Sequence, residues 1–367
     1  MTAKMPSMTQ ITHFNYPFTL RARHFSSSSI YRSSTSDSSP LSAASVASSF
    51  LSKFASLGPQ TRTQTLDANQ LQLLSLTLNR PTLYADSPHL SNAAPPPAGT
   101  PLPPGYHLAY FTPPFLEGEL GADGTDKSYN PESPFTRRMW AGGEVRWPRR
   151  DGEVLNPLRV GQEVRETTKV LSAEPKVVRK TGEEMIVVGV EKMFENEDGV
   201  AVIDRRNWVF RKALPTDGPK HNPPQPCVGV SSSQPAPEPS SPTAKVHVRT
   251  LKQTPVTLFR FSALTFNGHK IHYSLPWARE VEGHKSIVVH GPLNLISILD
   301  FWRDVRGQGG KSDEFSIVPE SISYRATNPL YAEEEYRMFL EEDGKEGRVQ
   351  IYGPTGDVAM KAEIRAF

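Results

Sequence analysis

Runs of alternating or β-branched apolar residues predict strands in the first half of the chain. The runs fall at 143–147, 162–172, 185–194 and 200–210, and the sequence Glu-Asn-Glu-Asp-Gly at 195–199 is a turn signal between the last two. An antiparallel meander is the simplest arrangement of these strands. Upstream, Asp67 precedes a leucine-rich run and predicts the start of a short helix.

The second half shows a different order. A run at 291–303 is apolar on nearly every helical face, which predicts a buried helix. Strand-like segments come after it, at 315–326, 335–340, 348–353 and 359–367. One apolar helix followed by four antiparallel strands indicates an α+β fold in which a sheet wraps around the helix, and this second half has the clearer helix.

Composition divides the chain further. Residues 214–244 are rich in Pro and Ser and have no apolar periodicity, so they read as a linker between a body at 60–213 and a body at 245–367. Residues 1–50 are rich in Ser and Thr, contain Arg21, Arg23 and Arg32, and have no acidic residue before Asp37. That composition is typical of a disordered mitochondrial transit segment, which predicts a location in the mitochondrial matrix. The alternative is an ordinary disordered tail.

Charge and cysteine content restrict the function classes. Lys and Arg number 41 against 39 Asp and Glu, a formal charge of +2 that gives no sign of nucleic-acid binding. No apolar run is long enough to predict a membrane span. The single cysteine, Cys227, rules out an intrachain disulfide and a cysteine-rich metal site.

A short internal repeat suggests two copies of one unit. Residues 76–84 align without a gap to residues 264–272, with identities at Leu, Thr and Asn. Under this alignment Tyr84 stands where the second copy has His272. We therefore expect one catalytic half and one half that shapes the pocket, although a chance match is the alternative.

The chemistry-bearing residues cluster in the second copy. Elimination of water from a 3-hydroxyacyl thioester needs a base for the C2 proton, an acid for the leaving hydroxyl and donors for the thioester oxygen. His272 suits the proton transfers near neutral pH. The run at 291–303 opens with Gly291 and Pro292, so its free amides can receive an oxyanion, and glycine allows a close approach.

These residues resemble the MaoC-like hot-dog hydratases, most closely the hydroxyacyl-thioester dehydratases type 2 of mitochondria, and are similar to the mesaconyl-C4-CoA hydratases. The family pattern Asp-x-Asn-Pro-[Leu/Ile]-His is preceded by Ala-Leu-Ser/Thr, and 263–265 and 271–272 fall on it. The segment 290–293 resembles the family's His-Gly-[Met/Pro]-Leu, whose glycine amide belongs to the oxyanion hole. The segments 103–111, 119–121 and 137–143 are similar to the mitochondrial branch.

The resemblance implies a double hot-dog fold, with two antiparallel sheets that each curl around or near a central helix, and a catalytic role for His272 and Asn267 with Gly291 in the oxyanion hole. Asn267 stands where the general family has a catalytic Asp, so it can hold water or the substrate hydroxyl but cannot transfer protons. Thr265, His269 and His290 are candidate auxiliary residues. The sequence leaves open which group orients His272. Near these histidines no third well-spaced ligand predicts a metal, and no cofactor is expected.

The implied substrate is a (3R)-hydroxyacyl thioester on acyl carrier protein, converted to a trans-2-enoyl thioester in mitochondrial fatty-acid synthesis. The alternatives are a hydratase of a short or dicarboxylic enoyl-coenzyme A, a thioesterase or non-catalytic hot dog, and an inert assembly subunit. Arg137 and Arg138 are candidate contacts for the phosphates of either carrier, or else part of a solvated face. A fused pair of units is expected to act as a monomer or as a homodimer.

Overall fold

The computed structural model describes residues 41–84, 87–90, 94–150, 154–179, 181–214, 239–307 and 317–367. Residues 1–40 of the expected transit segment and 215–238 of the expected linker lie outside this set. The helices are α1 (Ala43–Leu57), α2 (Ala68–Thr77), α3 (Pro255–Leu264) and α4 (Gly291–Gly307), with 3₁₀ turns at Tyr106–Ala109, Glu117–Glu119 and Lys270–His272 and a π-helical turn at Trp277–Val281. The strands are β1 (Gln60–Thr65), β2 (Arg137–Arg146), β3 (Arg149–Arg150), β4 (Val154–Leu155), β5 (Glu163–Val177), β6 (Glu184–Asn196), β7 (Gly199–Arg211), β8 (Lys245–Lys252), β9 (Ser321–Ala326), β10 (Glu335–Asp343), β11 (Glu346–Tyr352) and β12 (Val358–Arg365).

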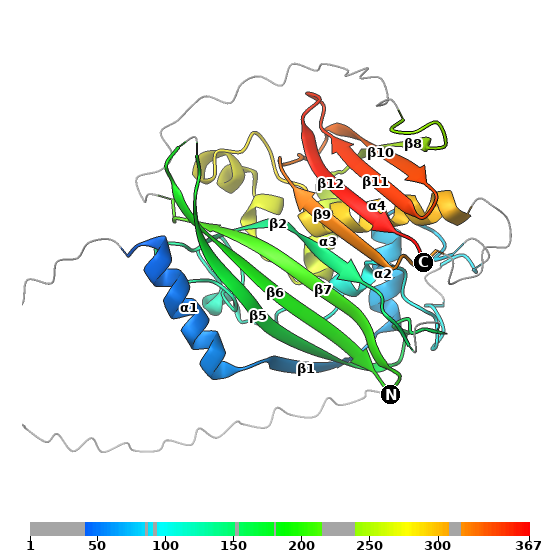
Figure 1. Cartoon of the computed structure of the whole chain (residues 1–367), viewed down its shortest axis with the longest axis horizontal. Coiled ribbons are helices and arrows are strands. Elements are labelled where there is room, and N and C mark those ends of the chain that lie inside the picture. The colour runs from blue at the N-terminus through cyan, green and yellow to red at the C-terminus, as the bar shows by residue number, and fades with distance from the viewer. Residues whose placement is uncertain are drawn as a thin grey trace, which may run out of the picture. The chain divides into compact units, whose positions relative to one another are not determined.

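Two successive parts of the chain repeat one order of elements (Figure 1). Each part begins with an edge strand and a ten-residue helix, β1 and α2 in the first and β8 and α3 in the second. The strand orders β1-β5-β6-β7-β2 and β8-β10-β11-β12-β9 are equivalent, and each ends where the two parts meet. The double hot-dog fold is therefore confirmed, as two copies of one α+β unit.

The two expected sheets are joined into one antiparallel sheet of ten strands. The joint is the pairing of β2 with β9, in which Gly142 faces Arg325 and Val145 faces Ile322. A Cβ on Gly142 would lie 2.5 Å from the carbonyl oxygen of Tyr324, so only glycine allows this close approach. The joint thus fixes how the two halves face each other across the cavity described below.

Helix α4 is the central helix of the second half, as its sequence predicted. Leu293, Ile296 and Leu299 are fully or almost fully buried, and so is Trp302 near its end. In the first half, the described residues between α2 and β2 form only the two short 3₁₀ turns at Tyr106–Ala109 and Glu117–Glu119. The clearer helix therefore does lie in the second half.

Helix α1 corrects the expected extent of the disordered segment at 1–50. Residues 43–50 form the first two turns of α1, which begins after the N-cap Ser42. Val46 and Phe50 are buried in an apolar cluster with Ile186 and Phe210 of the first-half strands. The Ser-rich composition hid this helix because its apolar residues are few, and its burial comes from tertiary packing.

Some of the remaining expectations from the sequence are confirmed, and others are not. Asp67 caps α2, because its side chain accepts a hydrogen bond from the Gln70 amide at 2.7 Å. Strands β5, β6 and β7 form the expected meander. Strands β1 and β8 and helix α3 were not predicted. The end of α2 at Thr77 corresponds to the end of α3 at Leu264, so the gapless alignment of the repeat was wrong by one position.

Candidate active site

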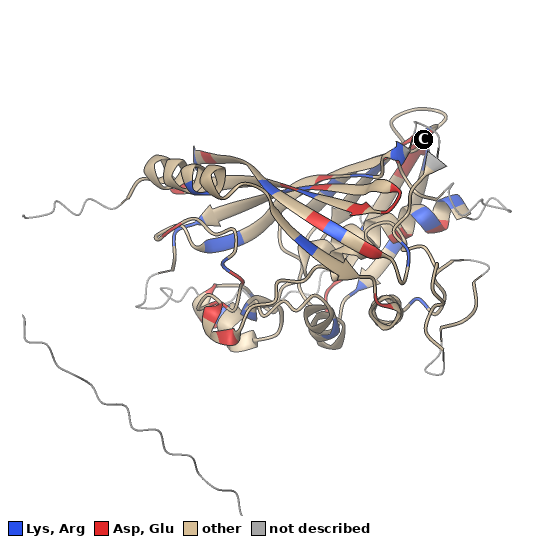
Figure 2. Cartoon of the chain, turned by 90° about the horizontal axis from the view of Figure 1, so that it is seen from below, with Lys and Arg blue, Asp and Glu red and all other residues tan. Residues whose placement is uncertain are grey.

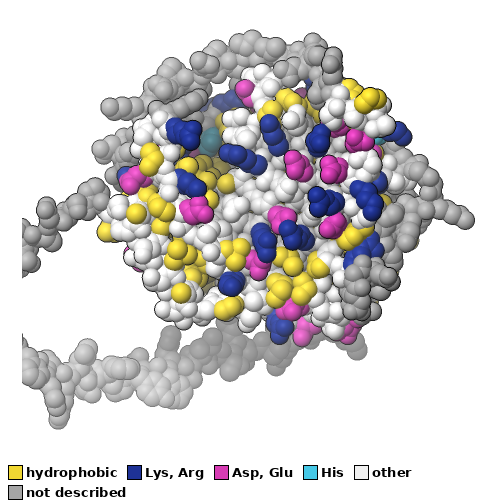
Figure 3. Space-filling model, in the orientation of Figure 1, with side chains coloured by type: hydrophobic (Ala, Val, Ile, Leu, Met, Phe, Trp, Pro, Cys, Tyr) yellow, Lys and Arg dark blue, Asp and Glu magenta, His cyan; other side chains and the backbone are white. Residues whose placement is uncertain are grey.

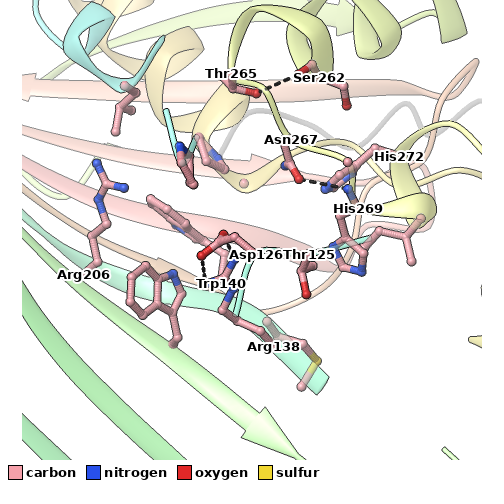
Figure 4. Close-up of a pocket in the computed structure, with 18 of the residues that line it drawn as sticks. Thr125, Asp126, Arg138, Trp140, Arg206, Ser262, Thr265, Asn267, His269 and His272 are labelled. Carbon is pink, nitrogen blue, oxygen red and sulfur yellow. Dashed lines mark hydrogen bonds and ion pairs between the residues drawn. The ribbon is translucent and has the colours of Figure 1, made fainter. Parts of the chain in front are cut away.

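A cavity of ≈ 1200 Å³ opens between the two halves (Figure 4). On the face drawn in Figure 3, the molecule is hollowed at the upper left, and Lys and Arg alternate with Asp and Glu elsewhere on that face. Figure 2 shows the same mixture of charge signs along the strands. Each site residue predicted from the sequence lines the cavity, except His290: Arg137, Arg138, Thr265, Asn267, His269, His272 and Gly291.

The loop after α3 presents the candidate catalytic residues. The helix ends at Leu264, and Phe266 adopts a left-handed backbone conformation with φ 48° that turns the chain. The Asn267 side chain then accepts a hydrogen bond from the His269 amide at 3.0 Å. Thr265 donates its hydroxyl to the Phe261 carbonyl at 2.7 Å, so that hydroxyl is used within its own helix.

The first half holds this loop in place. The Lys270 amide donates to the Asp123 carbonyl at 2.8 Å. Gly124 lies against Gly268 so closely that a Cβ on Gly124, at φ +82°, would lie 2.0 Å from the Gly268 carbonyl oxygen. Backbone groups of the first half therefore position the loop of the second half that carries the candidate catalytic residues.

The backbone carbonyl of Val288 orients His272. The Nδ1 atom of His272 lies 2.8 Å from this oxygen, which requires that Nδ1 carries the hydrogen and donates it. The Nε2 lone pair is thereby left for a substrate proton. Burial, and then the neighbouring His269, lower the pKa of His272 to about 3, so the ring is neutral at physiological pH and able to accept a proton.

The ring of His290 stacks on the ring of His272. The two rings stack at 3.6 Å between centroids, and His290 Nε2 lies 2.9 Å from the Ser262 hydroxyl. Burial, followed by His272, holds the pKa of His290 well below its usual range. His290 therefore acts as a neutral packing surface and is not among the described residues that line the cavity.

His269 brings carboxylates to the site that the local sequence did not show. Its Nε2 atom lies 3.7 Å from Glu282 Oε1 and 3.8 Å from Asp123 Oδ2. The His269 ring meets the His272 ring edge-on at 5.3 Å. Glu282 also accepts a hydrogen bond from Trp277 at 3.2 Å, which fixes its position. The site thus contains two histidines with different surroundings, one beside a backbone carbonyl and one beside two carboxylates.

Gly291 begins α4 at the cavity wall. A Cβ on this residue would lie 2.8 Å from Cδ1 of Trp140, a β2 side chain packed directly against it. The first amides of a helix have no partner within the helix, so those of α4 are available to a developing negative charge. This arrangement agrees with the oxyanion role expected of Gly291.

The two arginines differ in their surroundings. Arg138 forms an ion pair with Asp126 at 2.5 Å and lies 5.2 Å above the Trp208 ring. The Nε atom of Arg137 is buried and has no hydrogen-bond partner among the described residues. Arg137 is thus the better candidate for a phosphate, and contact with a carrier stays a prediction for both.

Sequence reasoning missed the charged side chains that the first half contributes to the cavity. Lys192 on β6, Arg206 on β7 and Glu166 on β5 line the same cavity. They lie far apart in sequence, and only the pairing of β5, β6 and β7 brings them together. Within the described ranges, no three His, Cys, Asp or Glu side chains converge as metal ligands. No described helix has the length and apolar character needed to cross a membrane.

Comparison with known proteins identifies the family. Residues 105–332 match the profile of the hydroxyacyl-thioester dehydratase type 2 family. The chain is 29% identical over 271 residues to a mesaconyl-C(4)-CoA hydratase of Chloroflexus aurantiacus, covering 73% of this chain and 85% of that protein. It is 26% identical over 261 residues to the mitochondrial hydroxyacyl-thioester dehydratase type 2 of Schizosaccharomyces pombe, covering 67% and 79%.

The fold has a matching crystal structure, the MaoC-like dehydratase of Phytophthora capsici, at a TM-score of 0.56 and 16% identity, covering 86% of this chain and 98% of that chain. At this identity the likeness concerns the fold alone. The profile match spans more than half of the sequence and both sides of the cavity. The chain therefore belongs to the hydroxyacyl-thioester dehydratase type 2 family, and its assignment as a hydro-lyase is confirmed.

Proposed function

We propose that the chain removes water from (3R)-3-hydroxyacyl thioesters to give trans-2-enoyl thioesters, with His272 as the acid–base residue. The observation that carries this proposal is the meeting of two features in one cavity. A neutral, oriented imidazole at His272 lines the same space as the first residue of α4, Gly291. These are the two parts that proton abstraction next to a thioester carbonyl requires.

The proposed reaction begins with the thioester oxygen at the free amides of α4. Nε2 of His272 takes the C2 proton while negative charge moves to that oxygen. The C3–oxygen bond then breaks, and the hydroxyl leaves as water after it receives a proton. Protonated His272 returns that proton directly or through a water held by Asn267, or His269 supplies one. The reverse sequence hydrates an enoyl thioester.

For the carrier, we propose acyl carrier protein in mitochondrial fatty-acid synthesis, with the protein in the matrix. The name of the Schizosaccharomyces pombe relative and the acid-poor composition of residues 1–36 support this. Both halves that form the cavity belong to one chain, so we propose that a monomer is sufficient for activity. Association of two such chains into a homodimer is compatible with this proposal.

A second candidate keeps the chemistry and changes the substrate. The Chloroflexus aurantiacus relative carries the name of a hydratase for a coenzyme A thioester, mesaconyl-C(4)-CoA. A short or dicarboxylic enoyl-coenzyme A is therefore the alternative substrate for the same site.

The test follows the enoyl-thioester absorbance with purified protein and 3-hydroxyacyl thioesters on both carriers. The proposal predicts formation of the enoyl product without free thiol, and kcat/KM ranks the two carriers. Release of thiol without an enoyl product would identify a thioesterase. A folded protein that changes neither carrier's thioester would be an inert subunit, and either result would overturn the proposal.

A further inference from the structure

In the first half, charged side chains stand among the apolar residues, such as Phe194 and Trp208, that line the cavity. Lys192 and Arg206 both line it, and their side chains are only 12% and 16% exposed. Thr168 and Glu166 lie beside Lys192 on the same wall. Burying a charge costs free energy unless the charge is paired, so charged side chains that line a substrate cavity indicate a role in binding.

The protein pairs these cations only in part. Lys192 Nζ donates to Glu166 at 2.6 Å and to the Thr168 hydroxyl at 3.2 Å. Arg206 donates through Nε and Nη2 to Asp204 at 2.9 and 2.6 Å. Among the described residues, these bonds leave one hydrogen of Lys192 and the Nη1 group of Arg206 for another acceptor.

The two cations also repel each other. Burial lowers the pKa of Lys192, Glu166 opposes that shift, and Arg206 adds to it. A third cation, Arg62, lies 3.5 Å from the second oxygen of Glu166. Lys192, Arg206 and Arg62 thus share two carboxylates, Glu166 and Asp204, which leaves one positive charge unbalanced. An anion bound there would reduce this repulsion.

Trp140 connects this wall to the reacting centre. Its Cβ, Cγ and Cδ1 atoms lie against Gly291, and the Arg206 guanidinium lies 5.5 Å above its ring (Figure 4). Gly291 and Arg206 therefore contact the same indole. A short acyl chain that has its thioester oxygen at Gly291 and follows Trp140 would bring its far end to Arg206.

We propose that Lys192 and Arg206 form a subsite for a carboxylate at the far end of a short acyl chain. The inference rests on the proposed function and favours the second of its two substrate classes. A carboxylate would accept charge-assisted hydrogen bonds from both cations. A methyl group would remove water from the cations without forming a hydrogen bond to replace it. The phosphates of a carrier lie a whole pantetheine arm from the thioester and cannot occupy this position while the thioester oxygen is at Gly291.

The experiment compares hydration of two coenzyme A thioesters that differ only at the acyl end. Crotonyl-CoA ends in a methyl group, and fumaryl-CoA has a carboxylate in its place. We expect the wild-type full chain to favour fumaryl-CoA at least ~tenfold in kcat/KM, because its carboxylate would accept charge-assisted hydrogen bonds from both cations. Lys192→Met and Arg206→Gln should each lower this preference about tenfold.

The controls separate charge from folding. Arg205→Gln changes the neighbouring arginine, which is more exposed and paired with Glu191 at 2.8 Å, and should keep the wild-type preference. Lys192→Met combined with Glu166→Gln avoids a buried unpaired carboxylate if the single variant does not fold. Lys192→Arg should retain much of the preference.

Two results would overturn the subsite. One is a wild-type protein that hydrates crotonyl-CoA as well as or better than fumaryl-CoA, and the other is an unchanged preference in folded Lys192 and Arg206 variants. If neither thioester is hydrated, the proposed function fails instead. Calorimetric Kd values for the two thioesters then test the subsite alone, and equal values overturn it.

Discussion

The two halves share one strand order but differ in the segment after their first helix. After α3, the second half presents His269 and His272 and continues into the long helix α4. After α2, the described residues of the first half form only short turns before β2. The first half thus contributes loops and a sheet wall that carries Lys192 and Arg206 to the cavity, and the second half contributes the imidazoles and the helix end. Under the proposed function, one half of this duplicated fold supplies the chemistry and the other half contributes to substrate selection.

Tyr84 illustrates the divergence. The sequence alignment matched Tyr84 to His272, but Tyr84 donates its hydroxyl to the Pro101 carbonyl at 3.0 Å. The guanidinium carbon of Arg303 lies 5.5 Å from the centre of the Tyr84 ring. Of the pair Tyr84 and His272, only His272 is among the described residues that line the cavity. Substitutions in each half test this difference.

A large loss of activity is expected from Gly291→Ala. The added Cβ would meet Trp140 at 2.8 Å, so either the indole or the helix end must shift away from the thioester. Loss of one oxyanion donor costs ~10²–10³ in kcat, and we expect a loss in that range. Turnover of the enoyl thioester by the purified variant measures it.

Gly105→Ala is the matched control from the first half. Gly105 has a φ of +87°, which favours glycine, and an added Cβ would lie 2.7 Å from Cδ1 of Leu299. The substitution therefore strains the fold, but at a position away from the reacting centre. We expect a lower Tm and an unchanged kcat per folded molecule. Equal losses of kcat in both glycine variants would show that Gly291 has only a packing role.

Acid should destabilise the second half through its buried neutral histidines. The unfolded chain binds a proton at residue 272 below pH ~6.5, but the folded chain, with a pKa of about 3, does not. Stability present above pH 6.5 is therefore lost as the pH falls toward 3. His272→Gln should reduce the loss of unfolding free energy between pH 7 and pH 4 by on the order of 3 kcal/mol.

Urea unfolding of both proteins at the two pH values measures this difference, and identical pH dependence would contradict the burial of a neutral ring.

The pH dependence of stability is expected to differ in the first half. Burial alone would raise the pKa of Asp204, but Arg206 and His107 hold it below its usual range. Its contribution to stability is therefore present above pH ~3.9 and is lost only as the pH falls below that value.

A smaller effect is expected at Glu282, a positioning residue for His269. Glu282→Gln keeps the size of the side chain and removes the charge 3.7 Å from His269 Nε2. We expect kcat to fall about tenfold, the scale on which orienting partners act, while KM changes little. Glu280→Gln, an exposed neighbour in the same turn, is the control. A change confined to KM, or an equal effect in both variants, would remove the positioning role.

The sequence predicted those parts of the fold whose signals are local. The apolar run of α4, the Asp67 cap and the meander strands all have a residue period or a cap that survives in one sequence. Strand β8 and helix α3 also have local signals in the sequence, which are the alternation around Val246 and Val248 and the N-cap Thr254 before Pro255. Helix α1 owes its burial chiefly to β5 and β6, so composition could not reveal it.

The site divides in the same way. His272 and Gly291 were found because their motif is contiguous. The group that orients His272 is a backbone carbonyl, at Val288, and no side-chain pattern encodes it. Lys192 and Arg206 meet only through strand register, because Lys192 faces Asp204 across β6 and β7. Pairings of this kind need the three-dimensional topology.

The most direct test of the central claim compares His272→Ala with Tyr84→Phe, the two positions that the sequence alignment matched, in the full chain. Both proteins are assayed for the interconversion of 3-hydroxyacyl and enoyl thioesters, after circular dichroism has shown that each is folded. We predict a ~10²–10⁴-fold loss of kcat in His272→Ala and a change of about twofold or less in Tyr84→Phe. A folded His272→Ala protein with wild-type turnover would contradict the role of His272 as the acid–base residue.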